Sequence, residues 1–304
     1  MKRLVLMIVF AGVMAMTVGC AFSSPEKAYV RKAVKLMDRK GLFASGEEWE
    51  SAKAEALAAA PATMEEAYEV TRAALRVAGG KHSFISTKEN QESRAEEDKS
   101  LAPKVEVIEQ GIVLVRLPAF SGQDSEENRR YAHAVLDAIP ESVPGVIIDL
   151  RGNTGGNMYP MIAALHRFLP DGVLLQFRQR RFSMPVSREF VLRSIALEAQ
   201  PQVDCPVALL TDDHTASSGE AVLLCFRGLE NARSFGAPTA GYASANTPHP
   251  MPDGSKLVLT ESCDVARTGE VFCDDPIEPD ELTDCPLEAA LAWMSGALFK
   301  KSQK

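Results

Sequence analysis

The stretch Pro206–Phe226, PVALLTDDHTASSGEAVLLCF, decides the fold that the sequence predicts. It opens with a short, continuously apolar run, which is typical of a strand buried on both faces. It closes with a second apolar run, which we interpret as a helix. Between the two runs lie the small residues Ser217, Ser218 and Gly219. They can be ordinary helix caps, or a serine here can be a nucleophile whose anionic oxygen the helix dipole stabilises.

The same alternation of strand and helix runs through the second half of the chain. Residues 104–120 contain two β-rich runs around Gly111, and residues 125–139 have a helical pattern. The run PGVIIDL (144–150) is a second buried strand, followed by a helical pattern. We expect a further strand at 172–182, a hairpin at 255–272 and a closing helix at 286–298. Strands alternating with helices predict a layered α/β domain over residues 104–298, with 299–304 as a tail.

The first part of the chain has a different sequence pattern. Residues 26–78 show helical spacing, and Thr63 with Glu66 forms a capping-box pattern at the start of the third helix. We therefore predict an N-terminal helical subdomain over residues 20–86. Residues 87–103 are polar and charged, which predicts an exposed linker loop between the two parts.

Residues 1–19 combine a basic start, an apolar run and small residues, which is the pattern of a secretory signal peptide. The stretch TVGC resembles a bacterial lipobox, which implies that Cys20 is lipidated and becomes the mature N-terminus. We therefore expect a lipid-anchored protein of the bacterial cell envelope. Ala21, in place of Asp, favours the outer membrane or the periplasmic side in a Gram-negative cell. A plain signal peptide or a single membrane anchor is the alternative.

Composition excludes some classes of protein. The chain of 304 residues has a formal net charge of −8, which becomes −10 once Lys2 and Arg3 are removed. An acidic chain without a basic run argues against a nucleic acid partner. No second stretch is long and apolar enough to span a bilayer.

Five cysteines follow Cys20, and we expect them to lie in an oxidising compartment. Cys263 and Cys273 flank a hairpin turn, so we predict that they form a disulfide. Cys205 and Cys285 both precede proline and are a candidate second pair, whereas Cys225 lies in an apolar run and is expected to be a buried free thiol. None of the spacings resembles a zinc site, so no metal site is predicted.

Two further motifs contain residues suited to chemistry. GGKHSF (79–84) places His82 in a glycine-rich turn, although a lone histidine there is more often a surface or capping residue. IIDLRGNTGGNMYP (147–160) joins a buried strand to a helix through a turn with three glycines. Such a turn directs backbone N–H groups into a cleft, as an oxyanion site requires. Glycines in such turns also serve steric needs alone.

Taken together, these motifs resemble the serine peptidases grouped with the C-terminal processing (tail-specific) proteases and the tricorn core, in the branch without a PDZ domain. Six pieces in family order, between about residues 26 and 298, carry the resemblance: EEAYEVTRAAL…GGKHSF, DLRGNTGGNMYPM, HTASSGEAVLLCFRG, SFGAPTAGY, MPDGSKLVLT and PIEPDEL. The resemblance implies a crotonase-like ββα spiral core preceded by helices, and peptide-bond hydrolysis without a cofactor.

The resemblance also assigns roles to individual residues. It makes Ser217 the nucleophile, and it makes the backbone N–H groups of Ser218 and Gly155 the oxyanion hole. The processing-protease branch uses a lysine as base, but Tyr242 stands at that position, and a tyrosine hydroxyl ordinarily keeps its proton at neutral pH. The tricorn-like branch uses a histidine, which titrates in the required range, and His82 fills that position.

The resemblance also suggests an acidic residue for the site. The chain departs from the family pattern at two positions, and a second function is compatible with the same fold. Glu278 matches the region where the tricorn core places an acidic helper. Lys81 directly before the histidine and Thr154 in the glycine turn depart from the family pattern. The expected partners are a peptide or protein substrate and a membrane, and the oligomeric state is not predicted. The alternative function is a non-catalytic ligand- or peptide-binding lipoprotein on the same scaffold.

Overall fold

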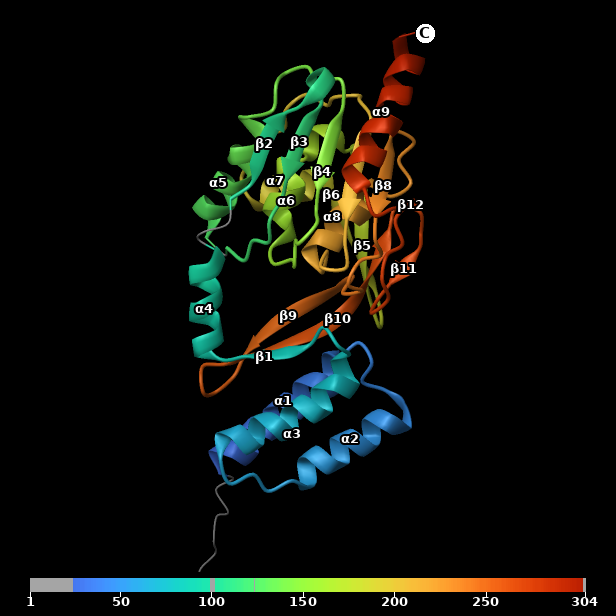
Figure 1. The fold of residues 1–304 in the computed structure, drawn as a ribbon. Coiled ribbons are helices and arrows are strands. Elements are labelled where there is room, and N and C mark those ends of the chain that lie inside the picture. Colours follow the sequence, from blue (N-terminus) through green and yellow to red (C-terminus); the bar gives the residue numbers. More distant parts are fainter. Residues whose placement is uncertain (1–23, 99–101, 123, 303–304) are drawn as a thin grey trace, which may run out of the picture.

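The computed structural model describes residues 24–98, 102–122 and 124–302. At one end of the molecule, α1 (Pro25–Lys40), α2 (Gly46–Ala58) and α3 (Met64–Gly79) form a helical layer (Figure 1). Helix α3 begins at the predicted cap, where Thr63 Oγ1 accepts a hydrogen bond from the N–H of Glu66. The Glu66 carboxylate accepts its return bond from Ala62 rather than from Thr63.

The helical layer packs on a long β-hairpin formed by β9 (Ser244–Pro250) and β10 (Lys256–Ala266). Apolar side chains of both parts make one core, which includes Tyr29, Met37, Trp49, Leu257 and Leu259. Strand β1 (Phe84–Ser86) leaves α3 and pairs antiparallel with β10. The glycine turn with His82 is therefore held between the helical layer and this sheet.

The sheet that contains the hairpin is antiparallel. It has the order β1-β10-β5-β6, with β9 and β11 also pairing with β10. The remaining members are β5 (Val173–Gln179), β6 (Ser183–Ser187) and β11 (Val271–Phe272).

The second sheet is mostly parallel and has the order β12-β8-β7-β4-β3-β2. Its strands are β2 (Lys104–Val107), β3 (Val113–Arg116), β4 (Val146–Asp149), β7 (Val207–Thr211), β8 (Ala232–Gly236) and β12 (Glu281–Leu282). Only β2 runs antiparallel to its neighbour.

Helices cover both faces of the second sheet, which explains why its central strands read as continuous apolar runs. Alternate strand residues such as Val146 and Ile148 face a core with α5 (Ser125–Leu136), α6 (Met158–Ala164), α7 (Arg188–Ser194) and α8 (Ser218–Phe226). The residues between them, such as Ile147, face α9 (Pro286–Ser302) on the other side. Short 3-10 turns lie at Glu109–Gly111 and His166–Phe168. This α/β arrangement agrees with the predicted fold class.

Two segments predicted without regular structure contain helix. The linker expected as a loop over 87–103 contains helix α4 (Lys88–Asp98). Thr87 Oγ1 accepts a hydrogen bond from the N–H of Asn90 at its start, and the segment is rich in good helix formers. The tail expected over 299–304 continues α9 to Ser302. The signal peptide over 1–19 and the lipidation of Cys20 lie outside the described residues and stay predictions.

The cysteines behave partly as expected. A disulfide joins Cys263 to Cys273, which confirms the prediction. Cys225 is a buried free thiol, also as predicted. The candidate pair of Cys205 and Cys285 is wrong, because Cys205 is buried, Cys285 is exposed, and the two are not joined.

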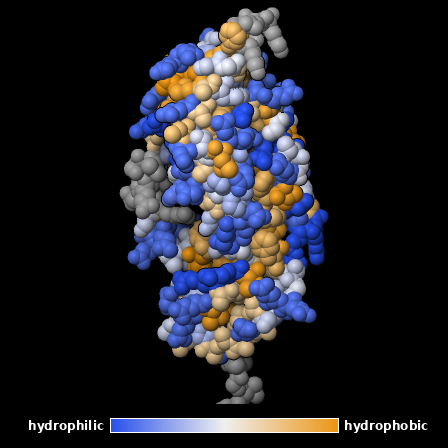
Figure 2. Space-filling model, turned by 45° about the vertical axis from the view of Figure 1, so that its right-hand side comes forward, coloured by the Kyte–Doolittle hydropathy of each residue, from blue (hydrophilic) through white to orange (hydrophobic). Residues whose placement is uncertain are grey.

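The described part of the chain contains no helix that is long and apolar enough to cross a bilayer. Figure 2 shows one face on which hydrophilic residues predominate and hydrophobic residues form small, separate areas.

Asp264, directly after the disulfide in β10, is a buried carboxyl that costs stability. It is 2% exposed, and its Oδ1 has no hydrogen-bond partner among the described residues. Burial, and secondarily the charge of Glu220, raises the pKa of Asp264 well above its ordinary value. The folded chain therefore binds this proton more tightly than the unfolded chain. Between the ordinary pKa of an aspartate and the raised pKa of Asp264, this residue makes the free energy of unfolding fall as the pH rises.

We expect Asp264→Asn to raise Tm by a few degrees at about pH 7.5 and by less at about pH 5, because the substitution removes the cost that grows with pH. About 1 kcal/mol corresponds to roughly 2–4 °C in a domain of about 150–250 residues. Scanning calorimetry at both pH values measures the change. Asp275→Asn, at an exposed position, is the control. A Tm that depends on pH in the same way in Asp264→Asn and the wild type would contradict this interpretation.

Candidate active site

Ser217 lies where the chain turns from β7 into α8, directly before the first residue of the helix. Its φ is +51°, in the left-handed region that residues other than glycine rarely adopt. Such strain persists only where the surrounding structure holds it, and it is concentrated at functional sites. The turn is therefore more than a helix cap.

The carboxylate of Glu220 holds this turn. Glu220 is fully buried, and its Oε2 accepts hydrogen bonds from the N–H groups of Ser217 at 2.7 Å and Tyr242 at 2.8 Å. Its Oε1 accepts from the N–H of Gly241 at 2.9 Å and from the hydroxyl of Thr239. Burial raises the pKa of Glu220, and the four hydrogen bonds oppose that shift. One side chain thus joins the serine to the segment of residues 239–242.

The glycine turn after β4 packs directly against the serine. A Cβ at Gly155 would lie 2.7 Å from the Cβ of Ser217 and 3.0 Å from the backbone nitrogen of Ser218, and the φ of Gly155 is +101°. No larger residue fits there without displacing the serine. The N–H of Gly155, however, donates to the buried Oδ1 of Asn153 at 2.9 Å. The N–H of Gly155 is therefore already bonded in this structure, and its role as an oxyanion donor stays a prediction.

Two other N–H groups near the serine are open. The N–H groups of Ser218 and Gly156 have no hydrogen-bond partner among the described residues. The two residues are in contact, because Ser218 Oγ donates to the carbonyl of Gly156 at 2.7 Å. Ser218, predicted as an oxyanion donor, is therefore placed to act, and the neighbouring glycine offers the second N–H.

His82 is fixed by three contacts from the β9 side. Its Nδ1 lies 2.9 Å from Ser244 Oγ, and its carbonyl accepts from Asn246 Nδ2 at 2.9 Å. Its ring meets the ring of Tyr242 edge to face, with centroids 5.2 Å apart. When Nδ1 carries the ring proton and donates a hydrogen bond to Ser244 Oγ, Nε2 carries no proton and is the basic nitrogen.

The structure brings His82 and Ser217 into the same region without a direct bond. The ring of His82 packs on Tyr242, whose N–H shares the Glu220 oxygen that also binds the N–H of Ser217. Within the described chain, no hydrogen bond joins Ser217 Oγ to His82. Catalytic hydrogen bonds are often long before substrate binds.

The acidic residue that bonds to the His82 turn is Asp274, and the role of Glu278 stays a prediction. Glu278 is exposed, and its carbonyl accepts a hydrogen bond from Arg227. Asp274 instead accepts the N–H of Lys81 at Oδ2. A Cβ at Gly80 would lie 2.3 Å from that oxygen. Asp274 follows the disulfide cysteine Cys273, so the disulfide fixes the residue that holds the turn before His82.

Sequence reasoning missed Asn153, Ser244 and Asp274. Asn153 lies in the glycine turn that was identified, but its inward-facing side chain has no signature in the sequence. Ser244 comes two residues after Tyr242, among small residues that give no signal. Asp274 competes with several nearby acidic residues, and only the fold distinguishes them.

The other described histidines do not contribute to this site. His214 is exposed, and its ring pairs with Asp213. It forms a small group with the exposed Asp213 and the half-buried Asp212. The remaining histidines bond to partners elsewhere: His133 to Asp137, His166 to Ala163 and His249 to Glu261.

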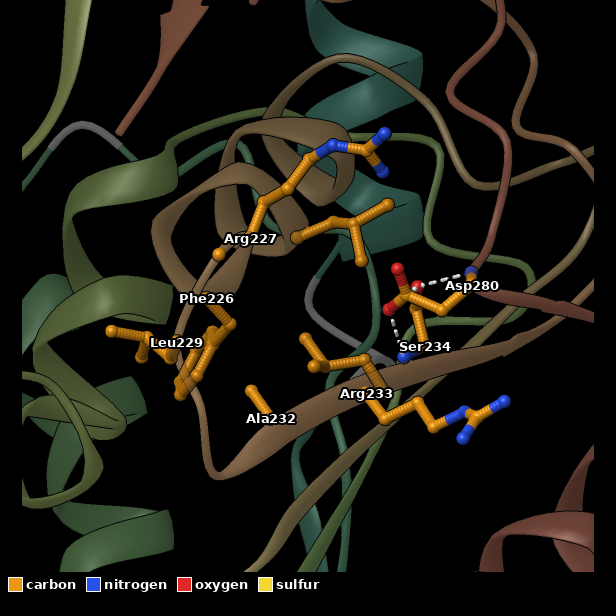
Figure 3. Close-up of a pocket in the computed structure, with 10 residues that line it drawn as sticks. Phe226, Arg227, Leu229, Ala232, Arg233, Ser234 and Asp280 are labelled. Atoms are coloured by element: carbon orange, nitrogen blue, oxygen red, sulfur yellow. Dashed lines mark hydrogen bonds between the residues drawn. The ribbon is translucent and has the colours of Figure 1, made fainter. Parts of the chain in front are cut away.

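Figure 3 shows a pocket near the other end of α8, around Phe226, Leu229 and Arg233. Asp280 binds Ser234 at its edge. None of the residues that hold Ser217 or His82 lines this pocket.

The comparisons with known proteins agree with this geometry. Residues 111–283 match the model of peptidase family S41, and the chain belongs to that family. It is 35% identical over 285 residues to the nisin-resistance protein of Lactococcus lactis subsp. lactis, covering 90% of this chain and 88% of that protein. It is 25% identical over 198 residues to the carboxy-terminal processing protease CtpA of Bacillus subtilis (strain 168), covering 65% of this chain and 40% of that protein. The solved structure of a lipoprotein from Streptococcus agalactiae has a TM-score of 0.82 at 29% identity, covering 90% of this chain and 96% of that one.

Proposed function

We propose that this protein is a serine peptidase in which Ser217 is the nucleophile and His82 the base. The observation that carries the proposal is the Glu220 carboxylate, which binds the N–H of Ser217 and the N–H of Tyr242 together. Tyr242 is the residue on which the His82 ring packs. Nucleophile and base come from segments far apart in the sequence, and this buried carboxylate supports their meeting at one site.

In the proposed reaction, His82 takes the hydroxyl proton of Ser217 while Oγ bonds to the carbonyl carbon of the scissile peptide. The tetrahedral intermediate collapses when the C–N bond breaks and His82 gives its proton to the leaving amine. Water then attacks the acyl ester and gives a proton to His82, which returns it to Ser217 Oγ. The products are a peptide with a new carboxylate and a peptide with a new amine.

The negative oxygen of the intermediate needs preorganised donors. We assign this role to the open N–H groups of Ser218 and Gly156 in place of the predicted Gly155. Gly155 provides the close approach of the two turns. Ser244 orients the His82 ring through Nδ1, as the third member of a serine peptidase triad does.

The substrate is a peptide or protein, as membership of the family implies. The relative from Lactococcus lactis is named for nisin resistance, so nisin is the first peptide to test. We expect incubation with the wild-type protein to give two product masses that sum to the peptide plus one water, and incubation with Ser217→Ala to give none. The proposal would be contradicted if folded wild-type protein left both nisin and the members of a general peptide library uncleaved.

A non-catalytic binding module is the second candidate. A fold alone does not fix a function. This candidate predicts that peptides bind and stay intact, and that the affinity is the same in the wild type and in Ser217→Ala.

For location, we propose a lipid anchor at Cys20 in the bacterial cell envelope. The motif TVGC supports it, and so does the similarity to a structure described as a lipoprotein. We expect Cys20→Ser to move the protein from the membrane fraction to the soluble fraction and to abolish labelling by a fatty-acid analogue, because stable anchoring requires acyl chains. Cys285→Ser, which removes an exposed cysteine, is the control. Retention of Cys20→Ser in the membrane fraction with its label would contradict the anchor.

A further inference from the structure

The side chain of Lys81 is held next to the proposed catalytic pair. Its Nζ donates to the carbonyl of Ala240 at 3.2 Å and lies 4.8 Å from the centroid of the Tyr242 ring. The ring of His82 also packs on the Tyr242 ring, with centroids 5.2 Å apart. An aromatic face attracts a cation at this distance, so the ammonium group has a defined position although the residue is exposed.

Gly241 makes room for this ammonium group. A Cβ at Gly241 would lie 2.9 Å from Lys81 Nζ, and the φ of Gly241 is +74°. The N–H of Gly241 binds the same Glu220 carboxylate that holds Ser217. The position of the Lys81 charge is therefore tied to the position of the serine through one buried side chain.

The charge of Lys81 is not neutralised by an ion pair with any described carboxylate. Asp274 accepts the backbone N–H of Lys81, and its carboxylate attracts the Lys81 charge from beyond ion-pair distance. A lysine ammonium has three N–H donors, and Ala240 accepts one of them. In a chain with a net charge of −8, this ammonium group, held at the Tyr242 ring on which His82 packs, is a local attraction for an anionic group.

We propose that Lys81 binds a carboxylate of the peptide substrate close to the scissile bond, and thereby selects where the peptide is cut. The inference rests on the proposed function in taking the surface beside Ser217 as the substrate site. The carboxylate can be the C-terminal group or the side chain of Asp or Glu, since both offer two oxygens to an ammonium group.

The test measures binding in Ser217→Ala, so that it does not require turnover. Isothermal titration compares one peptide in four forms: with a free or an amidated C-terminus, and with Glu or Gln at one internal position. We expect the carboxylate forms to bind about tenfold tighter, a typical effect of a charge-assisted hydrogen bond. We expect Lys81→Met in this background to remove the difference and Lys81→Arg to keep part of it. Lys256→Met, at an exposed lysine of β10, is the matched control and keeps the full difference.

The two sources of the carboxylate are distinguished by which pair of peptides shows the difference. Equal binding of all four forms, or a difference that survives Lys81→Met, overturns the inference. The same peptides with the wild-type protein test turnover separately. A carboxylate preference without cleavage would support the role of Lys81 and contradict the peptidase proposal. Cleavage without a carboxylate preference would support the peptidase proposal and contradict the role of Lys81.

Discussion

Ser217→Ala, His82→Ala and the double variant are all expected to reduce kcat to a similar low rate, by ~10³-fold or more. The two residues act as one unit, because the serine is a weak nucleophile until the histidine takes its proton. Removal of either residue therefore removes most of the rate enhancement that the two provide together. Steady-state kinetics on a peptide that the wild type cleaves give the three values. The residual rate in all three variants reflects the oxyanion donors and substrate binding.

Tyr242→Phe is the matched control for this series. The tyrosine hydroxyl has no hydrogen bond to any described residue, and the ring that packs on His82 remains. We expect a loss of about threefold or less, because the substitution changes no proton-transfer group. If His82→Ala keeps near-normal turnover and Tyr242→Phe is inactive, the assignment of the base is wrong. A double variant far slower than both single variants would show that the two residues act independently.

Glu220→Gln is expected to have the next largest effect. Each carboxylate oxygen accepts two hydrogen bonds, and the amide nitrogen of glutamine would face two donors in place of one of those oxygens. A hydrogen bond to a charged group contributes about 1.5–3 kcal/mol. We therefore expect the free energy of unfolding to fall by about 3 kcal/mol or more. We also expect kcat to fall by roughly 10²-fold, because a displacement of about 1 Å at a catalytic group has that cost.

Denaturant unfolding and peptide kinetics on the folded protein measure the two effects. The control is Glu278→Gln, at the exposed residue that the sequence had suggested as the acidic helper. It is expected to leave both quantities close to wild type. Normal activity and stability in Glu220→Gln would contradict the role of this carboxylate. A large loss of activity in Glu278→Gln would support Glu278 as the acidic helper.

Much of the fold follows from the periodicity of the sequence. The buried strand β4 reads as a continuous apolar run because helices cover both of its faces, and that pattern is visible in one sequence. Helix α4 was missed because its residues are polar on all sides, so no apolar face marks it. The extension of α9 to Ser302 was missed because charged residues at its end resemble a tail.

The site was predictable only in part. Ser217, His82 and Ser218 stand in motifs with an order along the chain that points to the family, and the disulfide follows from a short hairpin. The roles of Gly155 and Glu278 stay predictions, because a motif identifies a turn and does not show which atoms are already bonded. The N–H of Gly155 is occupied by the side chain of Asn153, and this requires the folded turn.

Active-site labelling with a fluorophosphonate tests the central claim most directly. The reagent forms a covalent bond with an activated serine oxygen, and peptide mass spectrometry locates the adduct. The proposed site predicts one adduct, at Ser217, in the wild-type protein. It also predicts a slow rate of labelling in His82→Ala and no adduct in Ser217→Ala. An unlabelled wild-type protein, or an adduct that persists on another residue in Ser217→Ala, would contradict the claim that Ser217 is the nucleophile.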